Sequence, residues 1–308
     1  PLKKIILFLS ILLSGSRISA ITENEKLASL CQVWGLLKYH HPVIAKGKHN
    51  WDAEFMAHVQ PVLQTNSREE LSALYLHWIA DLGKVKYRPC TKPLPSGAVT
   101  YLDNSWMDNK TLFTDSLSGL LHSIQHNRQR RKNYYAHRVF FGTGLLKLEH
   151  EEPYKDSIYP SAQMRMLCLS RYWNTINYFF PYKNIMDRNW DTVLYQMAPL
   201  FMHAADTSAY HVAIRRLAAS INDSHAGFST PYVSKYFGNR IAAFSYSIID
   251  GKAIVTGSYN DSLTKADDIR HGDIITHVDG RPVSDILAVY KPYTCASNDA
   301  AMLIRAGF

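Results

Sequence analysis

The 308-residue chain lacks the short motifs that bind nucleotides or build several common hydrolase centres. It contains no GxxxxGK(S/T) phosphate loop and no GxGxxG dinucleotide fingerprint, so nucleotide chemistry has no support in the sequence. No HExxH zinc motif and no GxSxG nucleophile elbow occurs either. These absences direct attention to chemistry that needs neither a bound nucleotide nor a metal ion, and we predict no cofactor.

Cysteine is scarce, and the four residues form no CxxC pair. Export from the cytoplasm would permit disulfides, but the spacing does not define a connectivity. Cys31 and Cys168 fall among expected helical core positions, where a buried free thiol is the favoured interpretation. The other two are Cys90 and Cys295.

Fourteen histidines are present, yet their spacing does not favour a metal centre. Glu149-His150-Glu151-Glu152 does not have the ligand spacing of a zinc helix. The histidines between residues 40 and 58, near Asp52, leave a zinc site there as the less favoured alternative. We therefore predict no metal site.

The composition is that of a folded protein with about two domains. Apolar residues make up 46% of the chain and charged residues 19%, which argues against intrinsic disorder. The formal net charge is +8, but Lys3, Lys4 and Arg17 contribute three of these charges within the first twenty residues. The basic run at residues 128–132 is interpreted as a solvated helix end or loop, and no nucleic-acid partner is expected.

Residues 1–20 have the pattern of a secretory signal. Two lysines precede an apolar run at residues 5–13, and Ala20 provides a small residue for cleavage. The run is shorter than the ~20 residues of an ordinary membrane span, and a buried N-terminal helix is the alternative. We predict an exported protein, periplasmic or extracellular, without a stable membrane span after signal removal.

The chain contains an internal repeat with an offset of 139 residues. Four positions in the first copy recur at this offset in the second, including two tryptophans and a proline. The matched sets are Trp34, Pro42, Trp51 and Asp52 in the first copy and Trp173, Pro181, Trp190 and Asp191 in the second.

Each copy is predicted to form three helices, because apolar residues recur at steps of three and four. Pro42 should stop the first helix, and Asn50 and Asn189 should cap the second helix of each copy. Catalytic roles for Asp52 and Asp191 are the less favoured alternative. The stripes are interpreted as core, with a ligand groove as the alternative. They comprise Leu27, Leu30, Trp34, Leu37, Phe55, Val59, Val62, Leu71, Leu74, Trp78 and Ile79, then Met166, Leu169, Trp173, Ile176, Val193, Met197, Leu200, Tyr210, Ile214, Leu217 and Ile221.

The rest of the chain has a mixed and then a β-rich pattern. Between the copies, strand-like runs at residues 98–102 and 134–148 flank a helical stretch at 117–125. Near the end, strands are expected at residues 241–249 and 252–259, joined by an Asp-Gly turn that favours a tight hairpin. A further strand is expected at residues 274–278.

Ser224-His225 is the pair that best suits catalysis. A histidine with a pKa near neutrality can take a proton from a hydroxyl nucleophile and return it to a leaving amine. Asn222, Asp223 and Ser224 are also ordinary turn and capping residues, and His225 can be a structural hydrogen-bonding residue. Residue types alone leave both interpretations open.

Taken together, the motifs resemble those of the C-terminal-processing and tricorn-like serine peptidases, in the branch of secreted proteins from Bacteroidetes-type bacteria. The resemblance rests on the blocks at residues 171–182, 189–191, 222–226 and 272–283 and covers nearly all of the mature chain. Each block alone has little specificity, whereas the combination is specific.

The resemblance implies roles for five residues. His225 would be the catalytic base and Ser224 a helper hydroxyl. The string at residues 272–275 would belong to a PDZ-like domain, which binds an extended peptide at a sheet edge. Phe237, Gly238 and Asn239 would form the loop that holds the C-terminal carboxylate of a polypeptide partner.

The implied fold class is multidomain α+β. A signal peptide at 1–20 would precede helical repeat one at 21–83 and a mixed subdomain at 84–160. Helical repeat two would follow at 161–230, and a PDZ-like domain, possibly incomplete, at 231–308.

The chain departs from the family pattern in one respect. In the family, the nucleophilic serine lies in an α/β domain that follows the PDZ-like domain, and residues 1–308 contain no such domain. We therefore expect the N-terminal part of a serine peptidase, inactive by itself. A non-catalytic PDZ-like module or a scaffold protein is the alternative. A Ser-His and a Ser-Lys mechanism both remain open.

Overall fold

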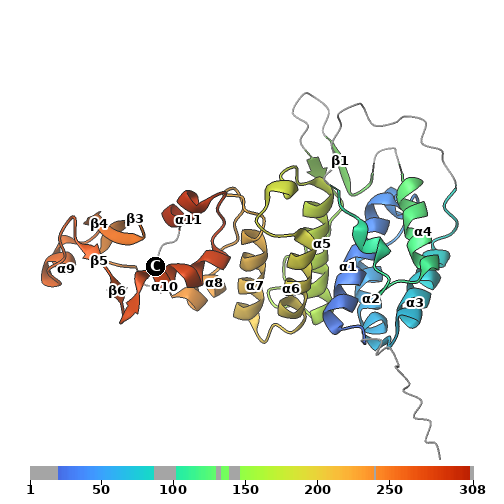
Figure 1. Ribbon diagram of the computed structural model, residues 1–308, viewed down its shortest axis with the longest axis horizontal. Helices are drawn as coiled ribbons and strands as arrows, with labels where there is room; N and C mark the ends of the chain where they lie inside the picture. Colours follow the sequence, from blue (N-terminus) through green and yellow to red (C-terminus); the bar gives the residue numbers. More distant parts are fainter. Residues whose placement is uncertain (1–19, 87–101, 130–132, 139–145, 239–240, 306–308) are drawn as a thin grey trace, which may run out of the picture.

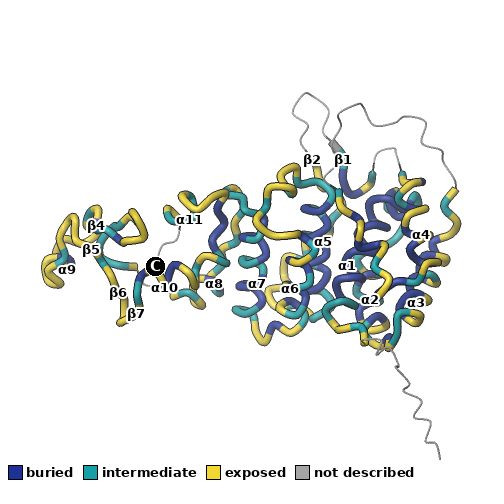
Figure 2. The backbone as a smooth tube through the Cα atoms, in the orientation of Figure 1, coloured by how far each residue is buried: buried dark blue, intermediate teal, exposed yellow. Residues whose placement is uncertain are grey.

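The computed structural model describes residues 20–86, 102–129, 133–138, 146–238 and 241–305. It has the predicted α+β composition, with helices predominating (Figure 1). A helical part, α1 to α7, carries most of the buried residues, and a smaller part with short strands extends from it (Figure 2). Residues 98–101 of the run expected at 98–102, residues 139–145 of the run expected at 134–148 and residues 1–19 of the predicted signal lie outside the described residues.

The first repeat has its three predicted helices, α1 (Glu23–His40), α2 (Trp51–Gln64) and α3 (Arg68–Asp81). Thr22 caps α1 in a reciprocal capping box with Glu25, which satisfies free backbone N–H groups of the first turn. The predicted stop at Pro42 is confirmed, because α1 ends two residues before it.

The second repeat repeats this order with α5 (Ala162–Phe179), α6 (Trp190–Met202) and α7 (Thr207–Ala219). Even the single 3-10 turns correspond, since Ile44–Lys46 (η1) and Lys183–Ile185 (η3) are 139 residues apart.

The second helices of the two repeats have the predicted caps, but one predicted core position differs. The side chains of Asn50 and Asn189 accept the backbone N–H groups of Ala53 and Thr192 at 3.1 and 3.0 Å, so both predicted caps are confirmed. The predicted core position Leu200 is wrong, because it is 37% exposed on the outer face of α6. The buried stripe of α6 is formed by other residues of the helix.

Within each repeat, the two matched tryptophans hold one another. The indole N–H of Trp34 donates to the carbonyl of Trp51 at 2.8 Å, and that of Trp51 donates back at 3.1 Å. Trp173 and Trp190 make the same reciprocal pair at 2.8 and 3.0 Å. Their rings are nearly parallel in both cases, 6.4 and 6.5 Å apart. These tryptophans are core residues, as predicted.

The two repeats are related by an approximate two-fold axis that runs between α1 and α5. Tyr39 meets its own counterpart Tyr178 at 5.1 Å, and Asn174 lies against its counterpart Gly35. The contacts of α2 with α5 are mirrored by those of α6 with α1. Such self-matching contacts define an isologous interface, here between two halves of one chain.

The insert between the repeats contributes α4 (Asp115–His126), which packs on α1 and α3. The 3-10 turn η2 (Ser105–Asp108) precedes it. Two short strands, β1 (Ala136–Arg138) and β2 (Leu146–Leu148), form an antiparallel pair.

The C-terminal part begins with α8 (Pro231–Phe237) and a three-stranded antiparallel sheet. The predicted hairpin of β3 (Phe244–Ile249) and β4 (Lys252–Ser258) is confirmed, and its turn has left-handed Asp250 and Gly251 with φ of 50° and 74°. The element order then continues through α9 (Asp261–Ala266) and β5 (Ile274–Ile275).

The single strand predicted at residues 274–278 is wrong, because it divides at Thr276. β5 pairs with β4, whereas β6 (His277–Val278) pairs with β7 (Arg281–Pro282) in a separate hairpin. The cause is the tight turn at Asp279, which is left-handed, together with a bond from the Val283 N–H to the Thr276 carbonyl at 3.0 Å. The last elements are α10 (Val283–Tyr290), η4 (Lys291–Tyr293) and α11 (Asp299–Arg305).

Candidate functional site

The Ser-His segment forms a turn directly after α7. His225 is exposed over 96% of its side chain, and its Nδ1 lies 3.0 Å from a carboxylate oxygen of Asp223. The same oxygen accepts the backbone N–H of His225 at 2.8 Å. One carboxylate therefore fixes both the turn and the imidazole.

The Asp223 carboxylate suits the role of an orienting group. Its pKa is lowered, first by the His225 backbone N–H and then by the imidazole itself. A carboxylate on Nδ1 favours the tautomer with a proton there and leaves Nε2 as the basic nitrogen. The Asp223–His225 pair can thus accept a proton on a solvent-facing nitrogen, as a general base must.

The sequence places Ser224 beside His225, but its hydrogen-bond partner in the structure is Ser297. Its hydroxyl accepts the backbone N–H of Ser297 at 3.0 Å and the Ser297 hydroxyl at 3.1 Å. Its own N–H donates to the Ser297 hydroxyl at 2.9 Å. This reciprocal pair joins the turn after α7 to the segment before α11. Ser224 therefore secures the turn to the C-terminal part.

A groove of about 640 Å³ runs along β3 in the C-terminal part. Phe237 and Gly238, at the end of α8, line it, as do Leu303 and Ile304 of α11. Gly238 ends α8 with φ of 98°, a conformation that favours glycine. Two of the three predicted carboxylate-loop residues therefore line a groove, and Asn239 lies outside the described residues.

The groove follows a sheet edge. Among the described residues, β3 pairs only with β4, so its other side forms the edge of the sheet. The Asp250-Gly251 turn closes on the pair Ile249 and Lys252, and hydrogen-bonded pairs alternate along an antiparallel ladder. The backbone groups of Ile248 therefore point away from β4.

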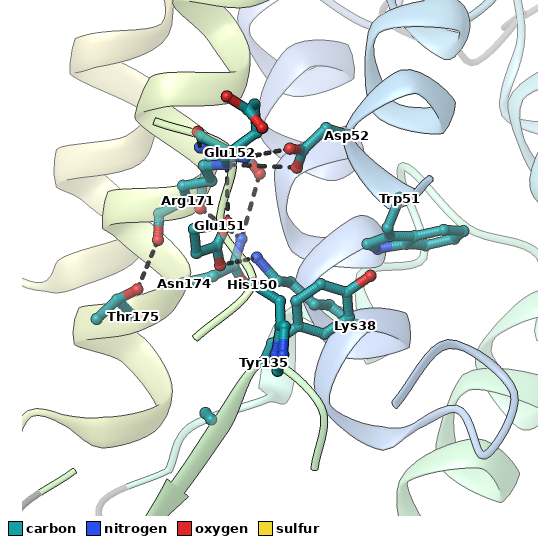
Figure 3. A network of polar contacts seen from close by, with 12 residues as sticks. Lys38, Trp51, Asp52, Tyr135, His150, Glu151, Glu152, Arg171, Asn174 and Thr175 are labelled. Atoms are coloured by element: carbon teal, nitrogen blue, oxygen red, sulfur yellow. Dashed lines mark hydrogen bonds and ion pairs between the residues drawn. The ribbon is translucent and has the colours of Figure 1, made fainter. Parts of the chain in front are cut away.

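A second polar cluster lies where the repeats meet (Figure 3). Arg171 from α5 forms ion pairs with Asp52 of α2 and with Glu151, and Glu151 also pairs with Lys38 of α1. Lys38 is fully buried, and this desolvation lowers its pKa. Asp52 thus has a structural partner, and its counterpart Asp191 accepts a hydrogen bond from Gln32 at 2.9 Å.

The described part of the chain offers no group of histidine, cysteine and carboxylate side chains suited to a metal ion. His40 and His41 are buried but do not belong to such a group. His150 Nδ1 lies 2.8 Å from the Tyr134 carbonyl. Cys31 is a free buried thiol whose pKa burial raises to about 12, and Cys168 is free and half-buried. Within the same ranges, no helix is both long and apolar enough to cross a membrane.

Sequence reasoning missed Asp223 as the partner of His225 and Ser297 as the partner of Ser224. Asp223 carried a signal, since an aspartate two residues before a histidine in a turn can bond both its N–H and its ring. Ser297 carried none, because 73 residues separate it from Ser224. Comparison with family models, curated proteins and solved structures gave no match.

Proposed function

We propose that this chain is the polypeptide-binding, N-terminal part of an exported serine-type peptidase, acting in the periplasm or outside the cell. An extended peptide would add to the edge of β3, and its C-terminal carboxylate would lie near Phe237 and Gly238. The observation that carries the proposal is the groove along an edge strand, lined in part by a glycine with positive φ. The C-terminal part would in that case be a PDZ-like domain.

The catalytic component of the proposal rests on Asp223 and His225. Nε2 of His225 would accept the proton of a serine nucleophile contributed by another domain, while Asp223 stabilises the imidazolium that forms. Ser224 would act as a helper by fixing the turn through Ser297. No cofactor is required for this chemistry.

A non-catalytic peptide-binding or scaffold protein is the second candidate. It is favoured by the groove itself, whose lining residues include neither Ser224 nor His225. The two candidates share the binding event and differ in whether bound peptide is cleaved.

Binding is tested by fluorescence anisotropy with extended peptides that end in a free carboxylate or in an amide. Ile248→Pro removes the outward N–H of the edge strand, whereas Ile248→Ala removes a similar apolar side chain and keeps the N–H. We expect the free-carboxylate peptide to bind more tightly and Ile248→Pro to bind at least ~10-fold more weakly than Ile248→Ala. Equal binding of both peptides by both variants would refute the groove as the binding site.

Catalysis is tested in a protein that joins this chain to a serine nucleophile domain. His225→Ala should lower turnover by ~10²–10⁴, with a smaller loss for Ser224→Ala. His203→Ala provides a matched control, because His203 is another exposed histidine paired with a carboxylate. Near-normal turnover of His225→Ala would remove it from the catalytic set and leave a Ser-Lys mechanism.

A further inference from the structure

A second groove, of about 520 Å³, lies along α5 next to α7, away from the β3 groove and beside the polar cluster of Arg171 and Glu151. Met164, Leu167, Cys168 and Tyr172 line it from α5, and Tyr210 lines it from α7. Its remaining wall is the segment at residues 148–160, which we name the strap. The lining is mostly apolar, and its charged residues are Arg171 and Glu151.

The first repeat contains the corresponding helix face, and there it is buried. The counterparts of Cys168 and Tyr172 in the first repeat are Ser29 and Val33, both 0% exposed. Cys168 and Tyr172 themselves are only partly buried. The same helix face is thus sealed in one repeat and half-open in the other.

In the first repeat, α4 packs on both α1 and α3, the helices that correspond to α5 and α7, and Ser29 contacts Tyr75 of α3 at 2.8 Å. The N-cap of α4 is Thr114, whose N–H donates to the hydroxyl of Ser72 at 3.0 Å. In the second repeat, the N-cap of α8 is Thr230, whose hydroxyl lies 2.9 Å from Nδ1 of His211, the counterpart of Ser72. α8 therefore begins where α4 begins.

α8 does not continue as α4 does. It has seven residues against twelve in α4, and it packs mainly on α7. The face of α5 that a full-length counterpart of α4 would cover therefore borders the groove, whose other wall is the strap, held to α7 by the Ile158 carbonyl 2.9 Å from Nε2 of His211. By the approximate symmetry of the repeats, this face has the shape that receives a helix.

The chemistry of the groove matches an apolar helix face. Arg171 is balanced by the carboxylates of Asp52 and Glu151, so it offers little net charge to a ligand. Around the groove, the strap exposes further large apolar side chains. They are Leu148 at 42%, Ile158 at 52% and Tyr159 at 42% exposure.

We propose that the groove along α5 docks an amphipathic helix of a partner protein. The helix would present large apolar residues at positions i, i+4 and i+7, as α4 presents Leu117, Leu121 and Ile124 to its own groove. The site is separate from the β3 groove, so this proposal does not depend on peptide binding there.

The probe is a fluorescein-labelled peptide with the sequence of residues 114–127, held helical by a lactam bridge on its polar face. A short free peptide would be only marginally helical, which is why the bridge is needed. A control peptide replaces the three apolar stripe residues by serine. We expect the probe to bind the full chain with a Kd on the order of 10–100 µM and the control peptide not to bind.

Met164→Glu is the diagnostic variant. Met164 is the third residue of α5 after the cap Ser161, and its counterpart Glu25 forms the capping box of α1. The substitution therefore suits the helix end while placing a polar group at the groove. It should weaken probe binding ~10-fold or more without lowering the unfolding temperature. Met164→Leu should bind normally, as should Leu200→Glu, which alters an exposed leucine of α6.

Three outcomes would overturn the proposal. Failure of the probe to bind at ~1 mM would do so, since a site of this kind should be measurable there. Binding that Met164→Glu leaves unchanged would place the peptide elsewhere. If an apolar dye binds the natural chain but not the Met164→Glu variant, and the peptide binds neither, the groove would be a small-molecule pocket instead.

Discussion

In the first repeat, the paired tryptophans continue into a longer aromatic stack, whereas in the second no further ring among the described residues stacks on Trp190. Trp51 stacks on Trp78 at 5.1 Å, and Trp78 stacks on His58 at 3.9 Å. The counterparts of Trp78 and His58 are a leucine and a methionine, Leu217 and Met197. The reciprocal tryptophan pair is therefore the common framework of each repeat, and the added rings are particular to the first.

The repeats also differ in what lies at the end of their first helix. His40 and His41 stand where the second repeat has Phe179 and Phe180. The first repeat is sealed by α4, and both of its histidines are buried. The second repeat is more open. The turn that follows it contains Asp223 and His225, and Ser224 in the same turn is hydrogen-bonded to Ser297. The first half is thus closed, whereas the second half leads into the Asp223–His225 turn and borders the groove along α5.

Among single substitutions, removing a framework tryptophan should give the largest effect. Trp34→Ala and Trp173→Ala should each lower the free energy of unfolding by about 3–5 kcal/mol, because a large buried ring and a hydrogen bond are lost. The loss should be greater for Trp34, which contacts Phe55 and has the Lys38 ammonium 4.6 Å from its ring. Urea unfolding of both variants measures the difference. A larger loss for Trp173 would contradict the idea that the first repeat is the better sealed.

Acid should destabilise the first repeat more than the second. Burial lowers the pKa of His40 and of His41 to about 4, well below the ordinary histidine value. The unfolded state therefore binds these protons at higher pH than the folded state. The stability due to the neutral rings is present above pH ~6.5 and is lost as pH falls toward 4, by up to about 3 kcal/mol for each.

The second repeat offers the matched substitution for this test. His40→Phe and His41→Phe together introduce the residues of Phe179 and Phe180. The double variant should lose less stability between pH 7 and about 4.5 than the natural chain, as measured by urea midpoints at each pH. An unchanged pH profile would show that other groups govern acid unfolding.

Much of the helical framework could be predicted from the sequence, because it depends on local rules. Apolar spacing located the helices, Asn50 and Asn189 identified two caps, and the fixed offset matched Trp34 with Trp173. These features need only neighbours within a few turns, or a comparison of the chain with itself.

The contacts between distant segments could not be predicted in this way. Arg171 looks like an exposed helix residue until α2 brings Asp52 beside it, and Ser297 has no local feature that points to Ser224. The strand divides at Thr276 because the residues before it pair with β4 and the residues after it pair with β7, and the local sequence does not specify this choice of partners. For the candidate site, the sequence supplied His225 and Ser224, and the structure added the groups that orient them.

The smallest of the three expected effects tests the approximate axis itself. A Cβ on Gly35 would lie 1.7 Å from the side-chain oxygen of Asn174, whose amide donates to the carbonyls of Cys31 and Ser170. Gly35→Ala should therefore lower the free energy of unfolding by about 2 kcal/mol, because the buried amide must move.

Because the two positions are counterparts, the pair can be exchanged rather than merely broken. Asn174→Gly relieves the contact but removes both amide bonds, so alone it should also destabilise. In the exchanged variant, Gly35→Asn with Asn174→Gly, the amide projects from α1 toward α5 and finds the same pair of carbonyl positions related by the axis. The exchange should recover at least half of the loss seen for Gly35→Asn alone, as a double-mutant cycle in urea would measure. Strict additivity of the two losses would show that the halves do not share a common geometry at their interface.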